Sequence, residues 1–346
     1  MNFLCSPSVV LPNGKFLVGN KLTMQMAMLD PTTLTWTSVP STGKSDFNAE
    51  EGWTLLPDGT IFTADVQNAP NSETYSTVLK QWTTAGSTIV DLHSPSPFGC
   101  INYGPGGSLC YFPPGEIGPA ILRPDGTVYA TGSTPQGSNT AHTAIYTPAS
   151  IAGGDGSWAV GPDFPAGDEA GDSFAALLTN GHVLVEGVSG RLYEFDGTSL
   201  TKGPFGFGSL FNLPTGEVIV GGSELYTSTG TYDPSWAPTI AHFPSSVTRG
   251  TTYKIAGTQF NGLSQAAAFG DEYETATNYP MVRITNVATG HVFYCKTHNH
   301  STMAVATGSK QVSTNFDVPS AAETGASTLE VVANGIPSLP VNVTVN

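Results

Sequence analysis

Charged side chains are scarce in this chain of 346 residues. They make up 11% of the sequence, whereas an ordinary globular domain carries about 25%. Basic residues are the scarcest, because 12 Lys and Arg stand against 27 Asp and Glu and leave a net charge of −15. Phosphate binding needs clustered Lys and Arg, so we expect no nucleic-acid partner.

Long apolar runs are also missing, and without a run of about 20 apolar residues no membrane span is expected. The first residues, Met-Asn-Phe-Leu-Cys, lack a basic region followed by an apolar stretch, so no signal peptide is visible. Lys and Glu, which are good helix formers, are few, whereas 40 Gly and 26 Pro supply turns. We expect a β-rich, acidic monomer that is extracellular or periplasmic; a cytosolic protein is the alternative.

Cysteine is limited to four positions, which are 5, 100, 110 and 295. Cys100 and Cys110 enclose a segment rich in Gly and Asn that a disulfide could close. We predict this disulfide, which would fit an oxidising compartment. The alternative is a pair of reduced thiols.

A repeated hairpin pattern organises the first two thirds of the chain. An apolar strand, a turn resembling Pro-Asp-Gly and a second apolar strand recur at 8–18, 52–64, 120–130, 175–185 and 210–220. Asn-Gly and Asp-Gly pairs between alternating apolar residues are a strong hairpin signal, and we expect positive φ at both central turn residues. The repeat therefore predicts five hairpins separated by loops of variable length.

A second hairpin follows most of these, and it often ends in a Trp. Four strands per unit at spacings of roughly 40–50 residues are typical of a β-propeller. The alternative is an array of unrelated β-sandwiches. The repeated LPDGTV hairpin, the Gly221-Gly222 doublet and the trailing Trp36, Trp82 and Trp158 resemble kelch-type propellers. Because kelch propellers of this kind usually have six or seven blades, the five visible units imply either a small ring or a ring that lacks its first blades.

The hairpin pattern stops near residue 233 and gives way to short alternating strands. Their spacing of roughly ten residues suggests an immunoglobulin-like β-sandwich. We therefore expect an all-β protein with a kelch-like β-propeller over 1–235 and an Ig-like, early-set sandwich over 236–346. This order resembles the galactose oxidase and glyoxal oxidase group, most specifically at the Thr-His that contains His298.

The resemblance implies that a hairpin of the second domain enters the propeller channel and offers His298 to copper. Those oxidases also resemble one another in a Tyr-His dipeptide, which this chain lacks, and in a cysteine cross-linked to a tyrosine, for which Cys5 is a candidate. In an extended segment His298 and His300 would point to one face, where they could bind Cu or Zn. The alternative is a pair of hydrogen-bonded histidines. If the hairpin enters the ring, Cys295 could form a disulfide with Cys5.

Long irregular loops are expected on one side of the propeller, since the tight turns face the other. These loops cover 41–51, 88–117, 133–142 and 162–172, and such loops usually carry function. They bring seven acids toward one rim: Asp46, Glu50, Glu51, Glu116, Asp168, Glu169 and Asp172. Crowded carboxylates can separate an acid from a base, and we predict Glu51 with Asp168 or Glu169 in these roles. Binding of Ca²⁺ and a merely solvated acidic rim are the alternatives.

Aromatic residues accompany the acids in the loop 88–117. Phe98, Tyr103, Tyr111 and Phe112 suit sugar binding, as does His142 of the next loop, although the aromatics could simply pack the loop. The first functional hypothesis is therefore a module that binds an extracellular glycan or other polymer. A carbohydrate-active hydrolase or lyase, a copper-type oxidoreductase and a structural scaffold are the others, so the sequence leaves open whether the protein is an enzyme.

Overall fold

A computed structural model describes residues 6–95, 99–102, 108–111, 115–150, 154–269 and 278–346. Within 99–102 and 108–111 only the backbone is described. The described residues form β-strands and one 3-10 helix, η2 (Pro234–Trp236). The chain is therefore all-β, as predicted.

Five antiparallel sheets follow one another along the chain. The first two contain β1 (Ser8–Val10), β2 (Phe16–Gly19), β3 (Met26–Asp30) and β4 (Thr35–Val39), then β5 (Thr54–Leu55), β6 (Ile61–Ala64), β7 (Asn71–Ser76) and β8 (Gln81–Ser87). The third contains β11 (Ala120–Leu122), β12 (Val128–Thr131), β13 (Thr143–Thr147) and β14 (Ser157–Val160). The fourth and fifth contain β15 (Phe174–Leu177), β16 (Val183–Glu186), β17 (Arg191–Phe195) and β18 (Leu200–Phe205), then β19 (Leu210–Asn212), β20 (Val218–Val220) and β21 (Glu224–Tyr226). All five predicted hairpins are confirmed, but the fifth sheet has three strands of its own.

One turn closes the first hairpin of each sheet. Its glycine donates its N–H to the carbonyl three residues earlier, as in Gly14 to Leu11 at 2.8 Å and Gly59 to Leu56 at 2.9 Å. The turn glycines Gly14, Gly59, Gly126, Gly181 and Gly216 all have φ between 79° and 95°. The residue before each glycine is not among the described residues with positive φ, so the expected two-residue turn was wrong. A four-residue turn with left-handed glycine at its end forms instead.

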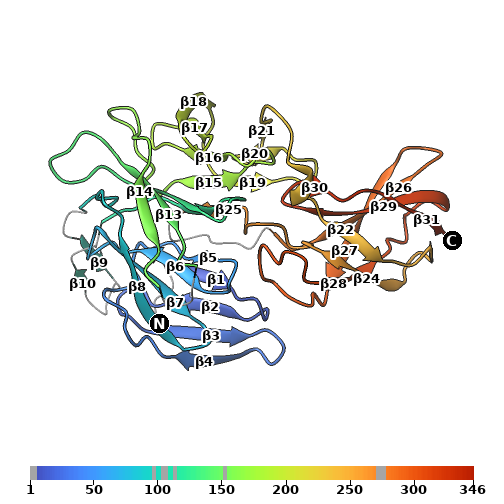
Figure 1. The fold of residues 1–346 in the computed structure, drawn as a ribbon, viewed down its shortest axis with the longest axis horizontal. Coiled ribbons are helices and arrows are strands. Elements are labelled where there is room, and N and C mark those ends of the chain that lie inside the picture. The colour runs from blue at the N-terminus through green and yellow to red at the C-terminus, as the bar shows by residue number, and fades with distance from the viewer. Residues whose placement is uncertain (1–5, 96–98, 103–107, 112–114, 151–153, 270–277) are drawn as a thin grey trace.

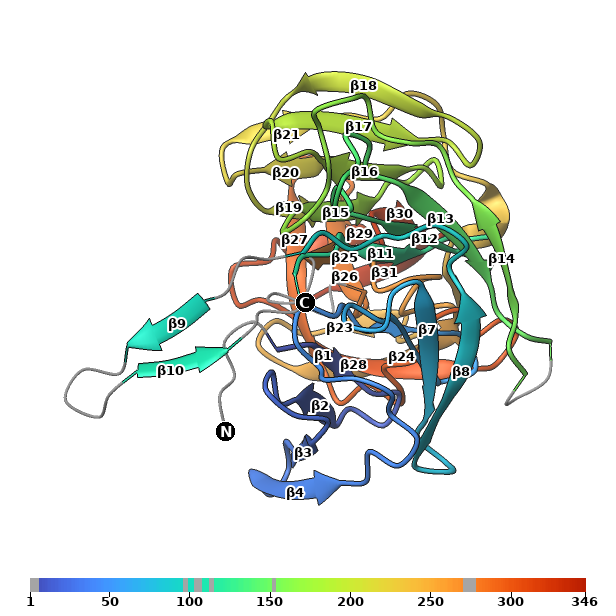
Figure 2. The same cartoon turned by 90° about the vertical axis from the view of Figure 1, so that its left-hand side faces the viewer.

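The five sheets fan out around a common centre in a propeller-like arrangement (Figure 2). Neighbouring first strands are in contact from β5 to β11, β15 and β19. Apolar side chains fill the spaces between successive sheets, and one cluster joins Val9, Leu55, Phe62 and Tyr146 of the first three. The core is therefore a series of layers between sheets rather than one central mass.

A separate hairpin, β9 (Gly99–Asn102) and β10 (Ser108–Tyr111), projects away from the sheets (Figure 2). Its register places the backbones of Cys100 and Cys110 directly opposite each other. This pairing suits the predicted disulfide, which stays a prediction because the side chains lie outside the described part.

The C-terminal part, on the right of Figure 1, is one long sheet in the order β22-β24-β28-β27-β26-β29-β31-β23, with β30 on β29. Its strands are β22 (Thr239–His242), β23 (Ser246–Val247), β24 (Thr252–Thr258), β26 (Met281–Asn286), β27 (Val292–His298), β28 (Val312–Asp317), β29 (Gly325–Ala333), β30 (Ile336–Pro337) and β31 (Val341–Val345). Its apolar faces enclose a core of their own, which includes Ile255, Ile284, Phe316 and Leu329.

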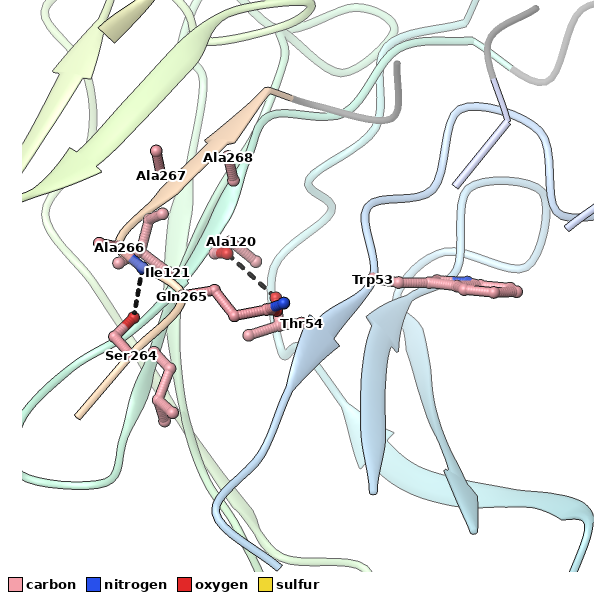
Figure 3. A pocket seen from close by; sticks show the side chains of 10 residues that line it. Trp53, Thr54, Ala120, Ile121, Ser264, Gln265, Ala266, Ala267 and Ala268 are labelled. Carbon is pink, nitrogen blue, oxygen red and sulfur yellow. Dashed lines mark hydrogen bonds between the residues drawn. The ribbon is translucent and has the colours of Figure 1, made fainter. Parts of the chain in front are cut away.

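The centre of the propeller-like part is filled by β25 (Ala267–Phe269), which comes from the C-terminal part and pairs with β15. Gln265, just before it, accepts the N–H of Leu55 at 3.3 Å, and its side chain points toward Thr54 in Figure 3. The cavity left there measures about 20 Å³, room for about one water molecule. A C-terminal segment does enter the centre, but it is not the His298 segment implied by the oxidase resemblance.

The C-terminal part also covers the side that bears the five glycine turns, which we call the tight-turn face. Pro12 accepts hydrogen bonds from Met303 N–H and Thr302 Oγ1 at 2.8 and 3.0 Å. Trp236 lies against the Gly181 turn, and Gly335 lies against the Gly216 turn. The opposite side, the loop face, carries the connections between sheets.

Candidate carboxylate site

Two groups of carboxylates lie on the loop face, where the connections between sheets meet. The first, which we call the sealed cluster, surrounds Lys44 and consists of Asp46, Glu51, Asp65 and Glu73. The second, the open cluster, consists of Glu50, Glu116 and Asp172, with Lys21 beside Glu50.

The sealed cluster is held by one ammonium group. Lys44 Nζ lies 2.6 Å from Asp46, 2.9 Å from Glu51 and 2.7 Å from Glu73. The side chains of Lys44 and Glu51 are 0% exposed, and the Trp82 ring centroid lies 5.1 Å from the ammonium. All three donors of Lys44 are therefore used within the protein interior.

Protons compensate the excess negative charge of the sealed cluster. Burial raises the pKa of Glu51 well above its ordinary value, against the attraction of Lys44. Burial and the neighbouring Asp46 raise the pKa of Asp65 to about 7. Burial alone would lower the pKa of Lys44, but Glu51 and Asp46 outweigh it and hold that pKa above its usual range. The arrangement joins the first two sheets without access for a substrate.

The open cluster is built by three successive connections. Glu50, Glu116 and Asp172 come shortly before the first strands β5, β11 and β15. Because first strands surround the centre, these residues converge there, and one oxygen from each lies within 4.8 Å of the others. Lys21 Nζ binds Glu50 at 2.6 Å.

Exposure and charge differ within the open cluster. Glu50 is buried, Glu116 is half-buried and Asp172 is exposed. Burial, then the charges of Asp172 and Glu50, raise the pKa of Glu116 to about 8, and Glu116 shares a hydrogen bond with Asp172. A carboxyl group that keeps its proton at neutral pH beside a second carboxylate can serve in acid–base chemistry.

The three acids predicted as catalytic have other partners. Glu51 is fully buried on Lys44, so the acid or base role predicted for it does not fit its position. Asp168 accepts bonds from Ser189 Oγ and Tyr193 OH, both at 2.6 Å. Burial would raise the pKa of Asp168, but these bonds outweigh it and lower that pKa. Glu169 accepts the N–H of Thr134 at 2.5 Å. Asp168 and Glu169 therefore fix the loop that carries Asp172.

The residues predicted to bind sugar are only partly described. His142 lies on the loop face, and its Nδ1 is 2.8 Å from Asp163. Phe98, Tyr103 and Phe112 lie outside the described residues, as does the side chain of Tyr111. Their role stays a prediction.

The two histidines predicted to bind metal lie in the C-terminal sheet and the loop after it. His298 Nε2 is 3.0 Å from Asp317, and His300 Nδ1 is 2.9 Å from Thr314 Oγ1. Burial, then the nearby His298, lower the pKa of His300. Each ring thus has a hydrogen-bonded nitrogen, as in the alternative interpretation.

Cys295, on β27, is a free, buried cysteine that packs in the core of the C-terminal part. Cys5 lies outside the described residues. The predicted Cys5–Cys295 bridge therefore stays a prediction.

Within the described part of the chain, the groups of three or more possible metal ligands are all-carboxylate. Asp46, Asp65 and Glu73 form one group, but Lys44 already supplies a cation there. Glu50, Glu116 and Asp172 form the other, and their oxygens suit a hard cation such as Ca²⁺ better than Cu or Zn.

Sequence reasoning placed the open cluster on the correct rim but missed both lysines. Lys44 stands in the acidic segment STGKSDFNAEE as one of only 12 basic residues. A single Lys among acids in a long loop was the available signal for a buried ion pair.

No family model and no curated protein matches the sequence. Among solved structures, virginiamycin B lyase from Staphylococcus aureus is similar at 11% identity and a TM-score of 0.40, over 92% of this chain and 96% of that one. PorZ, a surface component of the type-IX secretion system of Porphyromonas gingivalis, is similar at 10% identity and a TM-score of 0.39, over 99% of this chain and 51% of that one. The extracellular domain of a putative hybrid two-component system from B. thetaiotaomicron is similar at 10% identity and a TM-score of 0.23, over 99% and 56%. These are distant likenesses and carry no activity over to this chain.

In the described residues no helix is long and apolar enough to cross a membrane.

Proposed function

We propose that the loop face binds an extracellular glycan and that the open cluster hydrolyses it by acid–base catalysis. The observation that carries this proposal is the hydrogen-bonded pair of Glu116 and Asp172, in which the pKa of Glu116 is raised to about 8. β25 fills the centre of the propeller-like part, and the C-terminal part covers the tight-turn face. The loop face is therefore the side open to a polymer.

In this mechanism Glu116 is the acid and Asp172 is the nucleophile. Glu116 donates its proton to the glycosidic oxygen while the exposed carboxylate of Asp172 attacks the sugar carbon and forms a glycosyl ester. Water then breaks the ester after giving its proton to Glu116. Two carboxyl groups that share a hydrogen bond leave no room for a water between them, so we expect retention of configuration, with the pair opening to about 5–5.5 Å around the bound sugar.

The charge of the site favours a neutral substrate. Glu50 adds a third carboxylate, which Lys21 holds at 2.6 Å, and the whole chain carries −15. A polyanionic chain would be repelled by this field. A neutral polysaccharide is therefore the substrate class that fits best.

The experiment is a reducing-end assay on soluble neutral polysaccharides, namely mixed-linkage β-glucan, xyloglucan, galactomannan and xylan. Wild type should cleave at least one, and Asp172→Asn should lose at least about 100-fold in rate. Asp163→Asn, an exposed acid on the same face, is the matched control and should keep its activity. Equal rates for wild type and Asp172→Asn would remove the mechanism, and cleavage of none of the four would remove the hydrolase assignment.

The finer assignments from the sequence belong to the same proposal. They are a kelch-type ring over 1–235, an Ig-like sandwich over 236–346 and an extracellular or periplasmic monomer. An oxidoreductase that binds Cu or Zn at His298 and His300 is the second candidate, since the two residues stand two positions apart at the end of β27 and just after it. Metal analysis of the purified protein distinguishes it from the hydrolase.

A further inference from the structure

A groove of about 490 Å³ lies on the loop face between the fourth and fifth sheets. Its volume falls within the range of about 300–1,000 Å³ that is usual for small-molecule sites. The turn between β16 and β17, the connection from β18 to β19 and the start of β21 line it, with Val188, Ser189, Gly190, Phe205, Phe207 and Glu224.

Two aromatic rings are exposed in this groove. Phe205 is 66% exposed and Phe207 is 77% exposed. Arg191 lies 3.3 Å from the Phe205 ring centroid, and it also donates to the carbonyl of Gly203 at 3.2 Å. The guanidinium therefore covers and fixes one face of Phe205. Adjacent exposed apolar side chains of this size usually mark a binding surface.

The floor of the groove is made of glycine backbone. A Cβ on Gly206 would lie 2.9 Å from side-chain atoms of both Leu192 and Val220, so only glycine lets the connection lie this close to the core. A Cβ on Gly190 would lie 3.9 Å from the Phe207 ring. Aromatic walls, a floor without side chains and the exposed carboxylate of Glu224 provide stacking faces with a few hydrogen-bonding groups.

One loop links the groove to the open cluster. Ser189 donates to Asp168 from its N–H at 3.1 Å and from its Oγ at 2.6 Å. Val188 N–H donates to the carbonyl of Glu169 at 2.9 Å. One loop thus carries both Asp172 and the contacts that hold the near edge of the groove.

We propose that this groove is a glycan-binding subsite that holds a neutral polysaccharide leading to the open cluster. The sugar rings stack on Phe205 and Phe207, and Glu224 accepts bonds from their hydroxyl groups. This inference rests on the proposed function for the identity of the ligand. The negative charge of Glu224 and of the cluster beyond it excludes a polyanionic chain, as above.

The test separates binding from cleavage. Affinity electrophoresis measures binding of the four neutral polysaccharides, and hydrolysis of short 4-nitrophenyl glycosides measures the open cluster alone. The double variant Phe205→Ala/Phe207→Ala should bind polysaccharide at least about tenfold more weakly, since it loses both aromatic faces on which the sugar rings stack. Its turnover of the short glycosides and its thermal stability should stay as in wild type. Phe211→Ala, an exposed aromatic of β19 outside the groove, should bind like wild type.

Each other result counts against one proposal in particular. Unchanged polysaccharide binding by the double variant, or no binding by wild type, overturns the subsite. A dimer of the wild type that the double variant converts to a monomer also overturns it, because a second copy would then occupy the groove. If the double variant binds more weakly and neither wild type nor any variant hydrolyses a substrate, the subsite is supported and the hydrolase is removed.

Discussion

The sealed and open clusters meet at Glu51 and Glu50, neighbouring residues of one loop, and yet differ in their access to solvent and in how their charge is compensated. Glu51 is fully buried on Lys44, whereas Glu50 turns toward the centre and pairs with Lys21. The sealed cluster has an ammonium with all its donors used, and the open cluster has a proton shared between Glu116 and Asp172. A raised carboxyl pKa is therefore no sign of function by itself, because Asp65 and Glu116 both have one. Access to solvent distinguishes the two.

The largest effect is expected for Lys44→Met, which tests the structural role of the sealed cluster. The change leaves buried carboxylates without their cation, and breaking a buried ion pair costs about 3–5 kcal/mol. Urea unfolding should show a loss of this size. Lys15→Met is the matched control, since the pair of Lys15 with Asp30 lies at the surface, where such pairs contribute at most about 1 kcal/mol. Equal losses for the two variants would contradict the comparison.

A second prediction exchanges one carboxyl group in each cluster for an amide. Glu116→Gln removes the proton donor of the open cluster and should lower hydrolysis by about 100-fold or more, with little effect on unfolding. Glu51→Gln keeps an oxygen for Lys44 and should leave hydrolysis unchanged. Rate assays and urea unfolding of both variants check this. Loss of activity in Glu51→Gln without loss of stability would place the chemistry in the sealed cluster instead.

How far the sequence could predict these features depends on the range of the interactions behind them. The five hairpins follow from local turn chemistry, in which glycine takes a positive φ, and propeller connectivity then places the acids on one rim. Which acid is buried depends on contacts across sheets, such as Lys44 with Glu73. The central strand β25 spans only Ala267–Phe269, too short for any pattern to reveal. The burial of Cys295 likewise depends on the packing of the whole C-terminal sheet.

The third prediction concerns pH and the sealed cluster. The pKa of Asp65 rises from 3.8 to about 7 on folding, so the folded protein keeps a proton that the unfolded chain releases. The contribution of Asp65 to stability is then fully present below about pH 4 and is lost as the pH rises to about 7. Asp65→Asn removes this loss. Each pKa unit corresponds to about 1.4 kcal/mol, so the rise sets an upper limit of about 4 kcal/mol, and we expect a gain approaching this limit at pH 8 and almost none at pH 4. Urea unfolding at the two pH values measures it, and a gain of equal size at both would show that Asp65 is ionised throughout.

The smallest effect is a change in the pKa of Glu116, expected for Asp172→Asn in the open cluster. Burial is the largest cause of the raised pKa of Glu116, and the charge of Asp172 is the next. Removing that charge should lower the pKa of Glu116 from about 8 by roughly one unit, while burial keeps it above 4.5. NMR titration of the Glu116 carboxyl carbon measures the change without any need for a substrate. Asp163→Asn should leave this pKa at its wild-type value, since Asp163 pairs with His142. A pKa of Glu116 that did not respond to Asp172→Asn would mean that the two carboxyl groups share no proton. The open cluster would then differ from the sealed one only in exposure, and the acid role of Glu116 would lose its basis.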